Sequence, residues 1–217
     1  MRGLIVKDYC LMIQRGSLML LYLFMAVIFS FTMDSTFTVA YLSMLGGFLA
    51  ISTISYDEAD NGYPFLMTLP ITAKTYALEK HVFAGMIQGS FWIFAVALQA
   101  LLALVRQDTQ QFLEELPVYA TFLLVFLILI SVLLPIELKF GVEKSRIVLL
   151  VLVGIIMFAA FMGVKILSPL TTLLNGLDLN LPALSGPMLA AGGLLLTAVI
   201  LAICVACSIH VMEHKEY

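Results

Sequence analysis

The chain has 217 residues, of which 62% are hydrophobic and 12% are charged, and its formal net charge is −3 at pH 7. A soluble domain of this length keeps most of its residues near water and has no interior large enough for so much apolar surface. The composition therefore excludes a soluble globular protein and predicts an all-α polytopic membrane protein, formed as a single transmembrane domain over residues 1–217.

The first predicted element is a helix over residues 1–15 that lies on the membrane surface. Leu4, Ile5, Tyr9 and Met12 recur there at near-helical spacing, while the basic residues fall largely elsewhere. This pattern suits an interfacial helix on the inner leaflet, placed before the chain turns into the bilayer.

Six charge-free stretches follow, and each reaches the roughly 18 residues that suffice for a spanning helix. We predict six transmembrane helices over residues 17–33, 37–55, 82–105, 118–134, 147–166 and 187–209. Nine of the eleven Lys and Arg residues fall on one side of these helices. Because positive residues stay on the cytoplasmic side, both termini are predicted to be cytoplasmic.

Two links between these helices carry structure of their own. The cytoplasmic link 56–81 starts with three acids, breaks at Asn61-Gly62 and continues through a short apolar run. Thr72 can then cap a new small helix with its hydroxyl. A plain linker needs none of this, so we predict a loop that is shaped to meet another protein. The extracellular link 168–186 is rich in Pro, Gly and Leu, which predicts short helices there.

Several kinds of functional site are missing from the sequence. No glycine-rich loop leads into a G-K-S or G-K-T, so the chain is not expected to bind ATP in that way. His210 and His214 lie one turn apart but suit a helix end at the membrane surface better than a metal site. No ionisable residue lies mid-membrane, which argues against an intramembrane enzyme. We predict no catalytic residue, no metal, no cofactor and no nucleic-acid partner for this chain.

The inner links resemble those of a known family. The family has a characteristic pattern in the loop between its second and third helices. In this chain the matching residues are Tyr56-Asp57-Glu58, then Asn61 and Tyr63, then Leu69-Pro70-Ile71 with Lys74 and Lys80. A second match is the basic segment 139–146 before the fifth helix. The chain is similar in these motifs to the small permease subunits of bacterial type-2 ATP-binding-cassette (ABC) exporters, which export peptides or bacteriocins or give immunity to them.

The resemblance implies a transport subunit of the bacterial plasma membrane, working with a second permease subunit and with cytoplasmic ATPase subunits that hold ATP and magnesium. Residues 1–15 would be the connecting helix. The residues that would couple to the ATPase are Thr72, Lys74, Thr75, Tyr76, Glu79 and Lys80, with Tyr76 as the main anchor. An ion pair would tie the inner loops together, drawn from Asp57, Glu58, Lys144 and Arg146.

The resemblance also implies a substrate path between two subunits, in a homodimer or a heterodimer. The second and fifth helices would line it with Phe48, Ile51, Ser55, Ile155, Phe158 and Met162. These sets are mostly apolar, which suits an amphipathic peptide or a lipid-like cargo. One alternative stays open, a substrate-binding membrane module of a vitamin importer. Such a module would place its polar binding residues at the extracellular end and would not need the shaped inner loop.

Overall fold

The computed structural model describes the backbone of residues 2–14, 16–58, 62–68, 71–175 and 186–215. Side chains are described there except at 64, 65, 67 and most positions between 142 and 191. Every regular element in these ranges is an α-helix, which confirms the all-α prediction. The helices are α1 (Arg2–Gln14), α2 (Gly16–Thr32), α3 (Ser35–Glu58), α4 (Gly62–Thr68), α5 (Ala73–Arg106), α6 (Thr109–Asn175) and α7 (Gly186–Glu213).

In the part of the chain that the structure describes, four helical segments are long and apolar enough to cross a membrane: Ser35–Glu58, Ala73–Arg106, Thr109–Gly141 and Gly192–Glu213. A fifth candidate is the pair α1 and α2, which are bent by 70° relative to each other. The polytopic membrane protein is therefore confirmed with four to five candidate spans. The count of six stays a prediction, because most side chains of the predicted span 147–166 lie outside the described residues.

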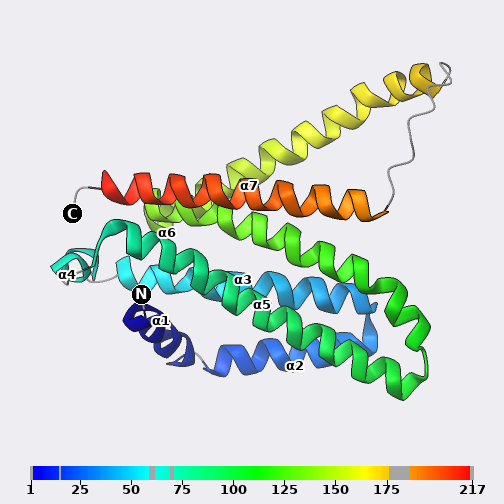
Figure 1. The fold of residues 1–217 in the computed structure, drawn as a ribbon, viewed down its shortest axis with the longest axis horizontal. Helices are drawn as coiled ribbons and strands as arrows, with labels where there is room; N and C mark the ends of the chain where they lie inside the picture. The colour runs from blue at the N-terminus through cyan, green and yellow to red at the C-terminus, as the bar shows by residue number, and fades with distance from the viewer. Residues whose placement is uncertain (1, 15, 59–61, 69–70, 176–185, 216–217) are drawn as a thin grey trace.

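The bundle has two distinct ends (Figure 1). At one end lie α4, the start of α5 and the C-terminal end of α7. At the other end lie the turn between α2 and α3 and the turn between α5 and α6. The chain thus brings α4, the start of α5 and the last turn of α7 to the same end, as the predicted topology requires.

A sharp reversal divides α6 at Gly141. The sequence predicted a loop over about 135–146, but the structure has helix on both sides of one glycine with φ 74° and ψ 168°. Only glycine adopts this conformation at little cost, because a Cβ would clash with the backbone. A Cβ at Gly141 would also lie 2.0 Å from Glu58 Oε1. We call Thr109–Gly141 the first arm of α6 and 142–175 the second arm, which diverges from the bundle in Figure 1.

The second arm reaches into the predicted extracellular link. Its backbone stays helical to Asn175, so residues 168–175 of the link 168–186 continue α6. Residues 176–185 lie outside the described part of the chain.

The core is built around α3, which packs against α1, α2, α5 and the first arm of α6. Two glycines of α3 allow this close approach. A Cβ at Gly46 would lie 2.7 Å from Phe91 Cβ of α5, and one at Gly47 would lie 1.4 Å from Ile130 Cδ1 of α6. Small residues at such positions let helix backbones come together in a membrane. Large apolar side chains cover the outside of the bundle, as lipid contact requires.

Candidate functional site

Four charged residues meet where α1 packs on α3 and α5, and we call them the four-charge cluster: Lys7, Asp8, Asp57 and Lys80. Lys80 Nζ lies 2.5 Å from Asp8 Oδ2 and 2.7 Å from Asp57 Oδ2. Lys7 Nζ lies 3.1 Å from Asp8 Oδ1 and forms a second ion pair with Asp57. Each lysine therefore contacts both aspartates, and the two positive and two negative charges balance.

This cluster is buried. The side chains of Asp8, Lys80 and Asp57 are 0%, 1% and 5% exposed, while Lys7 reaches the edge with 29%. Removing charges from water costs several kcal/mol for each ion, and only close pairing with good geometry offsets that cost. The balanced cluster therefore locks α1 in one position against α3 and α5.

Two hydroxyl groups complete the cluster. Thr53 Oγ1 of α3 donates to Asp8 Oδ2 at 3.3 Å and accepts from Lys80 Nζ at 3.2 Å. Tyr76 OH of α5 donates to Asp57 Oδ2 at 2.8 Å. The ring of Tyr63, in α4, packs edge-on against Tyr76 with 5.9 Å between centroids. The short helix α4 is thereby attached to the same buried polar network.

The start of α5 confirms the predicted cap. Thr75 N donates to Thr72 Oγ1 at 3.2 Å, and the helix runs from Ala73. It continues without a break to Arg106, so the predicted coupling segment forms the first turns of a 34-residue helix and not a separate helix. No proline or glycine interrupts the chain between 73 and 84, which explains the continuity.

The predicted coupling residues divide into two groups. Thr72 and Lys74 are exposed and Thr75 is half-buried, so these three are open to a partner. Tyr76, Glu79 and Lys80 are buried inside the chain. Tyr76 is therefore not an outward-facing anchor in this structure, because its ring and hydroxyl are taken up by Tyr63 and Asp57.

The four predicted registration residues have different surroundings. Asp57 pairs with the lysines of α1 and α5. Glu58 lies against Gly141, and Lys144 is exposed. The Arg146 side chain lies outside the described residues.

The C-terminal tail contributes to the same end of the bundle. Lys215 Nζ donates to the backbone oxygen of Leu138 at 2.9 Å and lies 4.1 Å from the ring centroid of Tyr63. Burial lowers the pKa of Lys215, and the nearby Glu58 carboxylate opposes that effect. The tail thus connects α4 to the first arm of α6.

Sequence reasoning missed Lys7, Asp8 and Thr53 as site residues. One signal was available. Asp8 lies four residues after Leu4 and four before Met12, and all three are buried on one stripe of α1. A charge on the apolar stripe of a helix needs a buried partner, which points to a lysine elsewhere in the chain.

The proposed path residues are only partly described. Phe48 is exposed and Ser55 is half-buried on α3, whereas Ile51 is buried in the bundle. The side chains of Ile155, Phe158 and Met162 lie outside the described residues.

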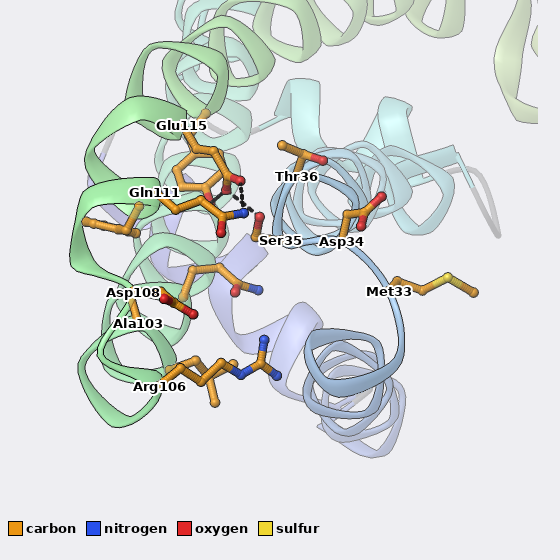
Figure 2. A pocket seen from close by; sticks show the side chains of 13 residues that line it. Met33, Asp34, Ser35, Thr36, Ala103, Arg106, Asp108, Gln111 and Glu115 are labelled. Atoms are coloured by element: carbon orange, nitrogen blue, oxygen red, sulfur yellow. Dashed lines mark hydrogen bonds between the residues drawn. The ribbon is translucent and has the colours of Figure 1, made fainter.

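A second feature is a cavity of about 280 Å³ at the other end of the bundle (Figure 2). The Glu115 carboxylate accepts three hydrogen bonds there: from Tyr119 OH at 2.5 Å, from Gln111 Nε2 at 2.9 Å and from Ser35 Oγ. Arg106 donates to the backbone oxygen of Ser30 at 3.3 Å. The cavity is lined by Met33, Asp34, Ser35, Thr36, Gln99, Leu102, Ala103, Arg106, Asp108, Gln111, Phe112, Glu115 and Tyr119.

These features define a class of protein before any comparison. An all-α bundle with several candidate membrane spans is a polytopic membrane protein. Among the described residues, no group of three or more His, Cys, Asp or Glu side chains could hold a metal ion.

The chain belongs to the ABC-2 family transporter proteins, whose family model matches residues 3–213. No match was found among curated proteins or among solved structures. The chain is therefore a membrane permease component of an ABC transporter. It has no nucleotide-binding site of its own, and the ATPase belongs to a partner subunit. This assignment favours the ABC permease over the vitamin-importer module.

Proposed function

We propose that this chain is the permease subunit of a bacterial exporter and that a separate ATPase drives it through the start of α5. The observation that carries the proposal is the four-charge cluster. It fixes α1 to α5 at the end of the bundle where Thr72 and Lys74 are exposed. The buried Tyr76, Glu79 and Lys80 then transmit the movement inside the chain and do not contact the ATPase.

The continuity of α5 supports this mechanism. A helix of 34 residues spans about 50 Å, at 1.5 Å for each residue. A displacement at Thr72 therefore moves the whole helix, including Arg106 at the cavity end. When the partner ATPase closes on ATP, the movement would reach both ends of the bundle through α5.

The proposed cargo is an amphipathic peptide. The cavity carries three acids, Asp34, Asp108 and Glu115, against one cation, Arg106, so its lining favours a positively charged group. On the outer surface of α3 the apolar side chain of Phe48 is exposed. A cationic and apolar peptide matches both features, and a lipid-like cargo matches the second.

The proposed topology places the cluster end in the cytoplasm and the cavity end outside. Its support is the charge asymmetry, because positive residues stay inside. The proposed path runs between two copies of the permease, along α3 and the second arm of α6. Cysteine at Phe48 tests it, since cross-linking between copies at this position should trap dimers and block export. Dimers that form only through α5 at Gly85 and Gly89 would refute this path.

Association with the ATPase tests the coupling surface. We expect Lys74→Glu to weaken binding of the partner ATPase about tenfold, which corresponds to about 1.4 kcal/mol. The matched control is Lys139→Glu, the same charge change on an exposed residue of the first arm of α6. Equal effects of the two variants, or none at Lys74, would place the coupling contact elsewhere. ATP hydrolysis by the purified chain alone would contradict the proposal that a separate subunit hydrolyses ATP.

A further inference from the structure

Glu79 of α5 is the one member of the predicted coupling set whose burial has no explanation so far. Its side chain is 0% exposed, and neither carboxylate oxygen has a hydrogen-bond partner among the described residues. The lysine next to it in sequence, Lys80, is already paired with Asp8 and Asp57. An ionised carboxylate in this position would have no ion-pair partner among the described residues, because both nearby lysines are paired with the two aspartates.

The charged groups that act on Glu79 come from three helices. Lys7 and Asp8 come from α1, Asp57 comes from α3, and Lys80 comes from α5 itself. Together with Glu79 they make three acids against two lysines. The four-charge cluster balances without Glu79, so the surplus negative charge falls on this side chain.

Among the described side chains of the other helices at this end, none forms a hydrogen bond or an ion pair with Glu79. Lys215, after α7, is held by Leu138 O and the Tyr63 ring, and α6 adds a further acid, Glu137. Within α5, Tyr76 donates to Asp57, and His81 Nδ1 is bonded to Ala77 O at 3.0 Å.

We propose that Glu79 is a proton-binding site that holds this side chain as a neutral acid while α1 is seated on α3 and α5. An unpaired carboxylate inside a protein is more costly than a neutral one by several kcal/mol, so such a group takes up a proton. Loss of that proton would leave a net negative charge beneath α1. The inference rests on the four-charge cluster and holds whatever the cargo or the ATPase.

The sign of the pH effect follows from proton counting. Between the pH at which an exposed glutamate ionises and the higher pH at which buried Glu79 ionises, the folded chain binds more protons than the unfolded chain, by up to one. The free energy of unfolding therefore falls as pH rises through that range. Glu79→Gln removes the titrating proton but keeps the shape and neutrality of the side chain, so its stability should lose this part of the pH dependence.

Infrared spectroscopy of the full chain in lipid nanodiscs provides the direct test. At pH 7 the wild type should show a protonated-carboxyl band that shifts in deuterium oxide. Glu79→Gln should remove the band, whereas Glu114→Gln, an exposed acid of α6, should leave it unchanged. Absence of the band in the wild type, or its persistence in a folded Glu79→Gln variant, would overturn the proposal.

Thermal unfolding gives a second readout that needs neither ATPase nor cargo. Between about pH 5 and pH 8 the wild type should lose stability more steeply than Glu79→Gln, while Glu114→Gln should follow the wild type. If Glu79→Gln fails to fold, Glu79→Asp keeps the acid, and its carboxyl band at pH 7 decides the question. Identical pH profiles in folded wild type and Glu79→Gln would refute the site.

Discussion

Replacement of Lys80 by methionine is the sharpest test of the four-charge cluster. The side chain is 1% exposed, and its Nζ contacts Asp8 Oδ2 at 2.5 Å and Asp57 Oδ2 at 2.7 Å. Methionine keeps much of the length and apolar volume of the lysine stem, so the change removes the charge with little loss of packing. Lys7 is then the only cation left between two buried aspartates.

The expected cost follows from that unpaired charge. Breaking a buried ion pair by removing one partner destabilises a protein by about 3–5 kcal/mol, since the other charge stays buried. The double variant Lys80→Met with Asp57→Asn restores one cation against one anion, Lys7 against Asp8. It should therefore be more stable than Lys80→Met alone, which makes the coupling between the two positions measurable in a double-mutant cycle.

Thermal or denaturant unfolding in detergent micelles measures these differences. Lys74→Met is the matched control, because Lys74 is exposed on the same helix and its loss should cost less than about 0.5 kcal/mol. The reasoning fails if Lys80→Met costs no more than Lys74→Met. It also fails if Asp57→Asn destabilises the Lys80→Met variant as much as it destabilises the wild type.

Three further predictions follow from local geometry. Thr72→Ala removes the cap of α5 and should cost about 1 kcal/mol in unfolding free energy, against no change if the cap is dispensable. Gly141→Ala should cost about 1–2 kcal/mol in backbone strain, whereas Gly89→Ala, with nothing within 4 Å of its Cβ, should cost nothing. Lys144→Cys should react with an impermeant label only from the cytoplasm and Asp108→Cys only from outside; reversed labelling would invert the topology.

The Gly141 comparison also shows where sequence reasoning reached its limit within one helix. The basic segment 139–146 resembled a connecting loop, and its charges supported that interpretation. The structure makes the connection with one residue, because glycine alone takes the positive φ that reverses the chain. Gly141 is the one glycine in the segment 135–146, but no periodicity or charge pattern marks it as the point where the chain reverses. The neighbouring Glu58 carboxylate, 83 positions earlier in the chain, fills the space a side chain would need.

Composition and spacing determined the class of this protein. In a bilayer, the backbone N–H and C=O groups of a long apolar stretch find hydrogen-bond partners when the stretch is helical. A threonine before such a helix can cap it, so both features follow from local chemistry. Burial of Tyr76, Glu79 and Lys80 could not be predicted in this way. It depends on Asp8, some 70 positions earlier, meeting Lys80 across two helices. Only the packing of α1 on α3 and α5 decides that Lys80, predicted to meet the ATPase, lies inside a buried charge network, because the energy of a charge depends on what surrounds it in space.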